Sequence, residues 1–154
     1  MGKMLRKAKI KDVKAIHALI DGYAGNGEML PCSLLELYEK IRDFYVFADD
    51  ETDEVLGTCA LHVCWEDLGE IRSLTVKVEK TMKGIGSEMV KACIEEARVL
   101  GIQKLFALTY KPDFFQKLGF KIIDKNILPH KIWSDCIKCS KFPECDETAM
   151  MMEQ

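Results

Sequence analysis

The feature that most constrains the fold is a helical pattern between two strand patterns, entered through two closely spaced glycines. The run KGIGS (83–87) follows an alternating strand pattern and leads into a helical pattern over about 85–100, which ends at Gly101. The apolar run 104–109 then predicts another strand, because short apolar runs next to a glycine are typical of buried strands. A strand, a glycine loop, a helix and a strand in this order predict a mixed α/β protein.

Gly84 and Gly86 stand where the helix begins. The first turn of a helix has free backbone amides and a partial positive charge, so it binds anions. Glycines let the backbone approach a pyrophosphate closely and adopt a positive φ without strain. The loop therefore predicts a pyrophosphate cradle, with a simple turn as the alternative. It is not the three-glycine dinucleotide fingerprint, and no Gly-Lys-Ser/Thr of a Walker A loop follows.

The rest of the chain alternates between strand and helix patterns. A helix is expected after Asp12 as its N-cap, and another after Ser33, where Ser33 and Glu36 form a capping box. The tail from about residue 128 is expected to be irregular and rich in cysteine. The predicted strands are 5–10, 44–49, 55–65, 70–78, 104–109 and 120–124. The predicted helices are 33–42, 85–100, 112–119 and a first helix from Asp12 that ends at Gly25 or Gly27.

Composition limits the classes of function. With 154 residues and a formal net charge of -3, the chain predicts one domain without the basic footprint of a nucleic-acid-binding protein. No apolar run reaches the length of a membrane-spanning helix, and the N-terminus lacks the apolar core of a signal peptide. The seven cysteines are an odd number and several lie in apolar runs, so a reduced, cytoplasmic protein is expected.

The order of elements over about residues 4–125 resembles the GNAT acetyltransferase superfamily. The loop from Thr81 to Gly86 resembles its Gln/Arg-x-x-Gly-x-Gly/Ala signature and departs from it at Thr81, while FFQKLGF (114–120) resembles its second marker. The resemblance implies a mixed central sheet with antiparallel N-terminal strands and a splayed pair of strands 4 and 5, flanked by helices. It also implies a GNAT domain over 1–127, on which a Cys-rich extension over 128–154 packs.

Acetyl-CoA is the cosubstrate that this resemblance implies, and no metal is required. The backbone of the fourth strand, the glycine loop and the short helix of the second marker would hold it. The expected cosubstrate-binding residues are Leu74, Thr75, Val76, Thr81, Met82, Lys83, Gly84, Ile85, Gly86, Ser87, Phe114 and Phe115.

The catalytic residues can be placed by the same comparison. Glu70 begins the fourth strand, where many members of the superfamily carry a base. Residues two apart on a strand share a face, so Arg72 would lie beside Glu70 as a clamp for a carboxylate, with a surface ion pair as the alternative. Phe115 replaces the tyrosine that usually acts as the general acid. Thr109 and Tyr110 carry the nearest hydroxyl groups that could act as the general acid. The alternatives are that Tyr110 only covers the coenzyme, or that the thiolate leaves without an acid.

Two segments, 27–47 and 128–151, resemble the short, single-domain N-acetylglutamate synthases of arginine biosynthesis. The resemblance implies L-glutamate as the substrate, with a homodimer possible. Acetylation of another amino acid or small amine, or a non-catalytic acetyl-CoA-binding regulator, are the alternatives. The expected substrate-binding residues are Leu30, Cys32, Arg72, Lys138 and Ser140. Cys32 and Lys138 occupy positions where the family usually has arginine, and Arg72 or Lys138 could supply the charge that Cys32 lacks.

Cys136, Cys139 and Cys145 lie within ten residues of the tail and leave three alternatives open. They could bind zinc with His130 or Cys32 as a fourth ligand, remain reduced, or form a disulfide. His17 and His62 are expected to be structural residues.

Overall fold

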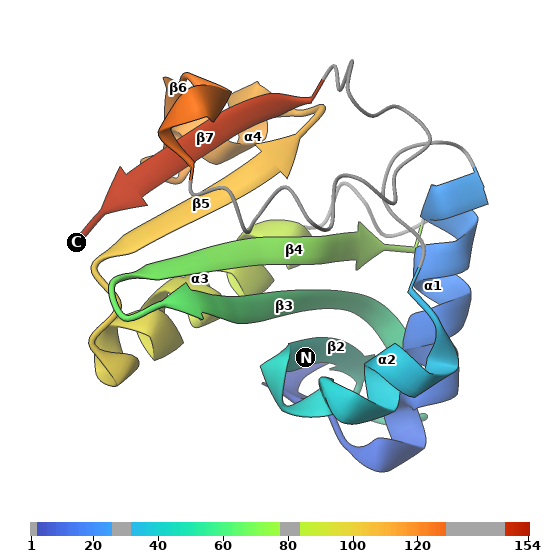
Figure 1. The fold of residues 1–154 in the computed structure, drawn as a ribbon. Helices are drawn as coiled ribbons and strands as arrows, with labels where there is room; N and C mark the ends of the chain where they lie inside the picture. Colours follow the sequence, from blue (N-terminus) through green and yellow to red (C-terminus); the bar gives the residue numbers. More distant parts are fainter. Residues whose placement is uncertain (1–2, 26–31, 78–83, 129–146) are drawn as a thin grey trace.

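The computed structural model describes residues 3–25, 32–77, 84–128 and 147–154. A seven-stranded sheet in the order β1-β2-β3-β4-β5-β7-β6 runs through the molecule (Figure 1). Among the strands of the described ranges, only β4 and β5 pair in parallel, and every other neighbouring pair is antiparallel. The strands are β1 (Lys3–Lys7), β2 (Phe44–Asp49), β3 (Val55–Trp65), β4 (Leu68–Val76), β5 (Lys104–Thr109), β6 (Lys121–Ile123) and β7 (Thr148–Glu153). The predicted mixed sheet with antiparallel N-terminal strands is confirmed.

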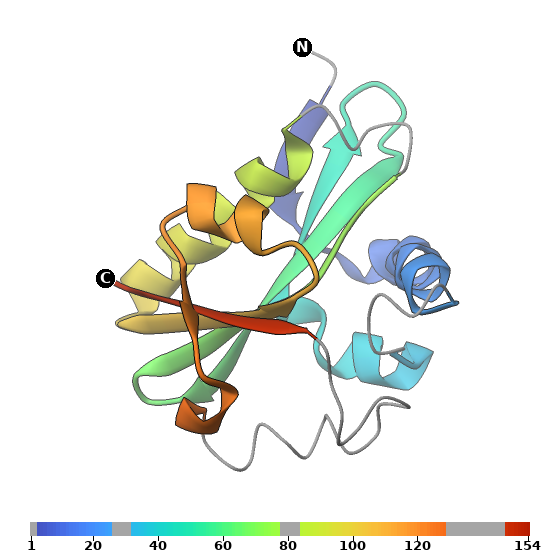
Figure 2. The ribbon, with the colours of Figure 1, turned by 90° about the horizontal axis from the view of Figure 1, so that it is seen from above.

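Helices cover both faces of the sheet, and the view from above separates α3 and α4 on one side from α1 and α2 on the other (Figure 2). No helix in the described ranges is long and apolar enough to span a membrane. The α-helices are α1 (Val13–Gly25), α2 (Leu34–Glu39), α3 (Ile85–Leu100) and α4 (Pro112–Lys117), and the 3-10 helices are η1 (Ile10–Asp12), η2 (Ile41–Asp43) and η4 (Lys125–Ile127).

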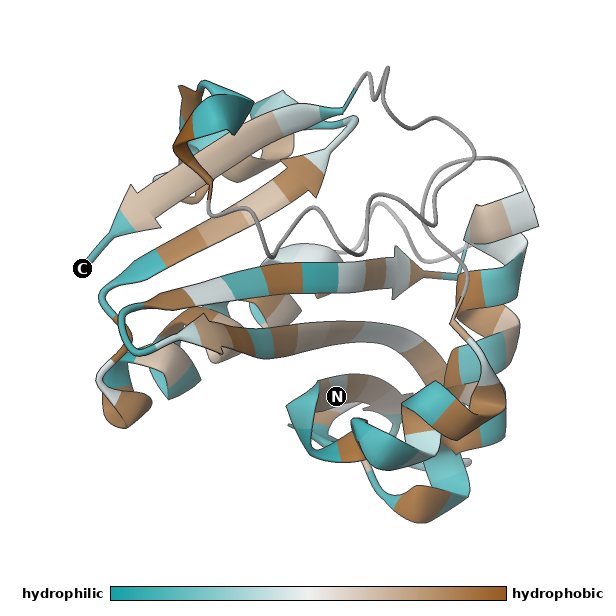
Figure 3. Cartoon of the chain, viewed as in Figure 1, coloured by the Kyte–Doolittle hydropathy of each residue, from teal (hydrophilic) through white to brown (hydrophobic). Residues whose placement is uncertain are grey.

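Helix α3 forms as the pattern of its sequence predicts. Met89, Val90, Cys93 and Ala97 recur at helical spacing and are all buried. The helix ends where Gly101 adopts a left-handed conformation with φ 87°, which glycine does without strain. Its buried stripe faces the apolar middle of β3, β4 and β5, so the helix is held against the sheet (Figure 3).

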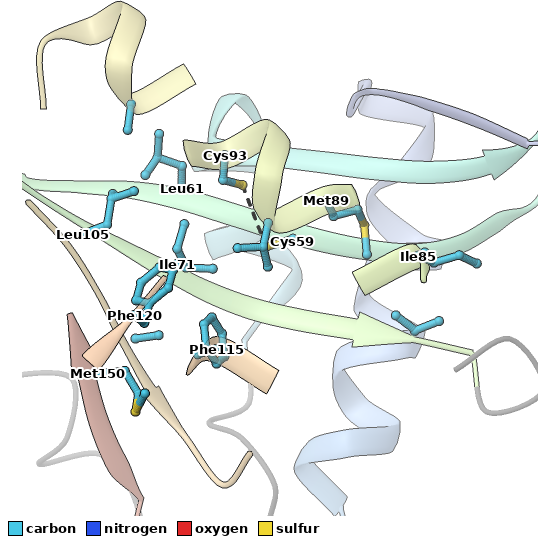
Figure 4. Close-up of a cluster of buried hydrophobic side chains, with 14 of the residues drawn as sticks. Cys59, Leu61, Ile71, Ile85, Met89, Cys93, Leu105, Phe115, Phe120 and Met150 are labelled. Carbon is cyan, nitrogen blue, oxygen red and sulfur yellow. Dashed lines mark hydrogen bonds between the residues drawn. The ribbon is translucent and has the colours of Figure 1, made fainter. Parts of the chain in front are cut away.

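The core on the α3 side contains a pair of thiols (Figure 4). The Cys93 thiol donates a hydrogen bond to Cys59 Sγ at 3.8 Å, and both residues are fully buried. The contact with Cys93 and burial in the core both raise the pKa of Cys59 well above its ordinary value. The Cys59 thiol therefore stays protonated, and both cysteines behave as small core residues.

Helix α2 begins with the predicted capping box. The Glu36 backbone N–H donates to Ser33 Oγ at 3.1 Å, and the Ser33 backbone N–H donates to Glu36 Oε1 at 3.3 Å. The helix ends at Glu39, and the 3-10 turn η2 replaces the predicted continuation to residue 42. This turn places Asp43 directly before the first residue of β2.

The prediction that Asp12 is an N-cap is wrong. The chain is already helical from Ile10, in the turn η1, and Asp12 is 3% exposed. Arg6 holds its carboxylate with two hydrogen bonds of 2.7 and 3.0 Å, and the Lys9 backbone N–H donates a third. Burial alone would raise the pKa of Asp12, but these hydrogen bonds lower it below its ordinary value.

The prediction of an irregular tail from about residue 128 is wrong over 148–153. This segment is strand β7, which lies between β5 and β6 and pairs antiparallel with both. Ala149 and Met150 are buried within it, so this part of the tail belongs to the central sheet.

Candidate active site

The parallel strands β4 and β5 separate part-way along the sheet. Their pairing runs from Leu68 opposite Lys104 to Glu70 opposite Phe106, and the two strands diverge beyond that point (Figure 1). Backbone groups on the facing edge of β4 are therefore not taken up by β5 after Glu70. The splayed pair that the family resemblance implies is present, and Glu70 lies where the separation begins.

A β-bulge in β4 decides which side chains face which layer. Ser73 has φ 58°, and the register with β3 shifts around it. On both sides of the bulge, apolar side chains point to the α3 layer: Ile71 before it, and Leu74 and Val76 after it. Because side chains alternate along a strand, Glu70, Arg72 and Thr75 point to the opposite face.

Glu70 and Arg72 form a charged pair on that opposite face. Arg72 Nε lies 3.8 Å from Glu70 Oε1, and the two side chains are 22% and 13% exposed. The predicted sharing of a face by these two residues is confirmed, whereas their roles as base and carboxylate clamp stay predictions. The low exposure strengthens electrostatic interactions at this position relative to bulk water.

Two apolar clusters flank this charged pair on the same face of the sheet. One lies beneath α1 and α2 and contains Phe44 and Ala60, and the other lies towards β5 and β7 and contains Leu68 and Phe106. The pair therefore occupies a polar strip between apolar walls, which is the usual composition of a small-molecule site.

The N-terminus of α3 forms a second part of the site, on the other side of β4. Gly84 caps the helix with φ 76°, a conformation that favours glycine. A Cβ on Gly86 would lie 3.5 Å from the ring of Phe114 and 3.8 Å from Leu74 Cδ1. Residues of α3, α4 and β4 thus meet here, and three predicted cosubstrate-binding residues are brought together.

The remaining described candidates have different environments. Ile85 and Phe115 are buried core residues, and the Phe115 ring packs edge to face against Phe114 at 5.1 Å. Thr109 Oγ1 accepts a hydrogen bond of 2.8 Å from the Lys111 backbone N–H, which leaves its hydroxyl proton for another acceptor. Tyr110 is exposed beside it. The proposed acid therefore remains a choice between two neighbouring hydroxyls.

Tyr23 on α1 reaches the edge of β4 that β5 leaves open, and sequence reasoning missed it. Its hydroxyl donates to the Val76 carbonyl at 2.8 Å and accepts from the Val76 N–H at 3.3 Å. The Lys77 N–H donates to Leu56 on β3, so the Val76 groups point away from β3 and into the gap. The available signal is that Tyr23 continues the apolar stripe of Ile16 and Ile20.

A second missed contact joins His62 on β3 to Asp43. His62 Nδ1 lies 3.0 Å from Asp43 Oδ2, and His62 stands directly opposite Glu70 in the β3–β4 register. His17 lies on α1, outside β3 and β4, and its Nδ1 is 3.4 Å from Asp21 Oδ2.

Several predictions fall outside the described residues. They concern Leu30, Thr81, Met82, Lys83, Lys138 and Ser140, and the thiols of Cys136, Cys139 and Cys145. Cys32 is described and packs against the cluster beneath α1 and α2. Among the residues that the structure describes, no group of three or more metal-ligating side chains gathers.

Comparison with known proteins agrees with this geometry. The family model of the acetyltransferase (GNAT) family matches residues 13–120. An uncharacterised N-acetyltransferase of Chlorobaculum tepidum is 41% identical over 147 residues, 96% of this chain and 94% of its own. An amino-acid acetyltransferase of Mycobacterium tuberculosis is 41% identical over 122 residues, 79% of this chain and 70% of its own.

Solved structures give the same result. A Mycobacterium tuberculosis protein in complex with CoA and NLQ superposes with a TM-score of 0.83 at 33% identity, covering 98% of this chain and 99% of that one. N-acetylglutamate synthase of Neisseria gonorrhoeae, complexed with coenzyme A and N-acetyl-glutamate, superposes with a TM-score of 0.88 at 26% identity. That match covers 99% of this chain but 35% of the synthase. The chain therefore belongs to the GNAT family and is an acetyl-CoA-dependent acetyltransferase.

Proposed function

We propose that the protein transfers the acetyl group of acetyl-CoA to the α-amine of L-glutamate, giving N-acetylglutamate for arginine biosynthesis. The observation that carries this proposal is the Glu70–Arg72 pair at the point where β4 and β5 separate. A carboxylate can take the proton of an ammonium group, and a guanidinium can hold a carboxylate in two parallel hydrogen bonds. An amino acid carries an ammonium group and a carboxylate on the same carbon.

The order of events follows from the chemistry. Glu70 removes a proton from the substrate ammonium, and the free amine attacks the thioester carbonyl of acetyl-CoA. The oxygen of the tetrahedral intermediate becomes negative and needs preorganised donors. Backbone N–H groups of the segment Leu74–Val76, among them that of Val76 on the open edge of β4, are the donors that we assign to it. The intermediate then collapses and expels the thiolate of CoA.

The thiolate takes up the second proton of the amine, either directly or through a hydroxyl. Thr109 and Tyr110, at the end of β5, are the hydroxyl groups that we assign to this step. The pyrophosphate of the cosubstrate would bind at the N-terminus of α3, where Gly84 and Gly86 permit close approach of the backbone.

The relatives support an amino acid as the acceptor. One relative is named an amino-acid acetyltransferase, and the gonococcal synthase was solved with N-acetyl-glutamate. Because the chain spans only about a third of that synthase, the substrate of the longer enzyme is a proposal for this one. The thiols of Cys59 and Cys93, which lie 3.8 Å apart without forming a disulfide, support a reducing, cytoplasmic setting.

The test is thiol release from acetyl-CoA by the purified protein with a panel of amino acids. We expect turnover with L-glutamate to exceed that with other acceptors. Preference for another amino acid would retain the chemistry and reject the glutamate assignment. Silence with every acceptor, while acetyl-CoA still binds, would reject the enzyme reaction in favour of a regulator.

The roles of the charged pair can be separated by two variants. Glu70→Gln keeps the size of the side chain and removes the base, so kcat should fall about 10²–10⁴-fold with unchanged affinity for acetyl-CoA. Arg72→Lys loses the bidentate fork, so KM for glutamate should rise about 10- to 100-fold with little change in KM for acetyl-CoA. Glu88→Gln, on the exposed face of α3, is the matched control for the loss of one carboxylate.

A further inference from the structure

We propose that His62 and Asp43 form a proton relay that carries the proton taken up by Glu70 to solvent. This inference rests on the proposed function, in which Glu70 is the base. The overall reaction consumes an ammonium group and a thioester and produces an amide, a thiol and one free proton. Glu70 must therefore release one proton in each turnover before it can act again.

The position of His62 relative to Glu70 follows from the register of the sheet. The two residues are direct partners in the antiparallel β3–β4 ladder, so their side chains leave the same face with Cβ atoms about 4.5–5.5 Å apart. That face is the one opposite α3, because the neighbours Leu61 and Ile71 both point into the α3 core. His62 is thus within reach of the Glu70 carboxylate directly or through one water molecule.

The orientation of the ring follows from Asp43. Asp43 precedes β2 on one side of β3, and Glu70 lies on β4 on the other side. Because a carboxylate only accepts hydrogen bonds, the 3.0 Å contact places the proton of neutral His62 on Nδ1. The two ring nitrogens point in nearly opposite directions, so Nε2 carries its lone pair towards the β4 side, where Glu70 lies.

Exposure gives the relay its direction. The side chain of Glu70 is 13% exposed, whereas His62 and Asp43 are 31% and 28% exposed. A proton that moves from Glu70 to His62 therefore moves from the half-enclosed polar strip to a group in contact with solvent. Other titratable or charged side chains on the flanking elements include Arg42 on η2, Arg72 on β4 and Cys64 on β3 itself, while β2 carries Tyr45 and Asp49.

Each step conserves protons and charge. The protonated Glu70 carboxyl gives its proton to His62 Nε2, which restores the Glu70 carboxylate and forms an imidazolium. The Nδ1 proton stays in place, and the negative charge of Asp43 stabilises the imidazolium. Nε2 then gives its proton to water. His62 acts through Glu70 and does not touch the substrate, so it is a positioning residue.

The experiment compares His62→Ala with the wild-type enzyme in steady-state acetyl transfer to the preferred amino acid, with and without added imidazole. We expect kcat to fall about tenfold or more, short of the full general-base contribution of about 10²–10⁴, with unchanged KM for acetyl-CoA. Added imidazole should restore kcat in proportion to its concentration, because it can carry the proton in place of the missing ring. Imidazole should leave the wild-type rate unchanged.

Two further variants keep the test decisive. Asp43→Asn retains the ring but removes the stabilising charge, so kcat should fall and imidazole should not restore it. His17→Ala, which removes a histidine that is also paired with an aspartate but lies on α1, should leave kcat unchanged. An active wild-type enzyme with unchanged kcat in His62→Ala, or with a loss that imidazole does not restore, overturns the relay alone. A wild-type enzyme that is inactive with every amino acid overturns the proposed function and the relay with it.

Discussion

Replacing Tyr23 with phenylalanine should weaken the fold slightly and strengthen the binding of CoA. The substitution removes one hydroxyl and leaves the ring in the stripe of α1. That hydroxyl makes two hydrogen bonds, of 2.8 and 3.3 Å, to the carbonyl and N–H of Val76. These two groups lie on the open edge of β4, which we assign to the thioester and its adjoining arm.

The magnitudes follow from the number and length of these bonds. A neutral hydrogen bond contributes about 0.5–1.5 kcal/mol net, and the freed Val76 groups can bind water. We therefore expect a loss of about 1–2 kcal/mol in the free energy of unfolding, or about 2–4 °C in Tm for each kcal/mol. In the wild-type protein, the Val76 N–H must give up its hydrogen bond to Tyr23 before it can bind the cosubstrate. Without this exchange, the free energy of CoA binding should become more favourable by about 1 kcal/mol, which is about fivefold in Kd.

Isothermal titration of CoA and thermal unfolding measure the two effects separately. Tyr38→Phe, on the exposed side of α2, is the control for loss of a hydroxyl at a surface. Weaker binding of CoA in Tyr23→Phe would refute the reasoning, because it would mean that the hydroxyl builds the binding edge. Equal binding in both proteins would mean that the cosubstrate does not use Val76.

Three other substitutions test separate parts of the fold and the site. Asp12→Asn should cost about 3 kcal/mol near pH 7, because it breaks a buried pair with Arg6. The pKa of Asp12 is lowered in the folded protein, so the stability difference between wild type and Asp12→Asn should persist above the unfolded pKa of about 3.9. It should vanish as the pH falls through the folded pKa, and urea unfolding across pH measures it. Gly57→Ala should cost about 1–3 kcal/mol in calorimetry, because its Cβ would lie 3.0 Å from the Thr75 carbonyl oxygen. Gly86→Val should raise KM for acetyl-CoA about tenfold by filling the cradle, whereas Gly86→Ala, whose Cβ has ordinary contact distances, should change it much less.

Local patterns were sufficient to predict most of the elements. The stripe of α3 and its terminal Gly101 define that helix within one stretch of chain, and the capping box of Ser33 and Glu36 depends on residues three apart. The Glu70–Arg72 pair also follows from a spacing of two on a strand. Each of these features is fixed by neighbours in sequence, which is why a single sequence reveals it.

Features that depend on distant neighbours were not predictable in this way. The bulge at Ser73 exists because β3 supplies one residue where β4 supplies two, and nothing in the alternation of β4 itself marks it. Strand β7 is rich in methionine, which is not typical of strands, and its partners lie far earlier in the chain. The reach of Tyr23 to Val76 spans 53 positions. The face of the sheet to which His62 points likewise depends on its pairing with Glu70 across β3 and β4.

The place of β7 between β5 and β6 affects the kinetics of folding. On the ribosome, β5 and β6 emerge before residue 148, yet they do not pair with each other and each waits for the strand that separates them. Until then, the edge of β5 beyond β4 is open, and such an edge can pair with another chain. Contacts of this sequence separation also slow folding, because the loop must close before they form. Folding of this half of the sheet should therefore wait for β7, and chains that stop short of Thr148 should aggregate rather than fold.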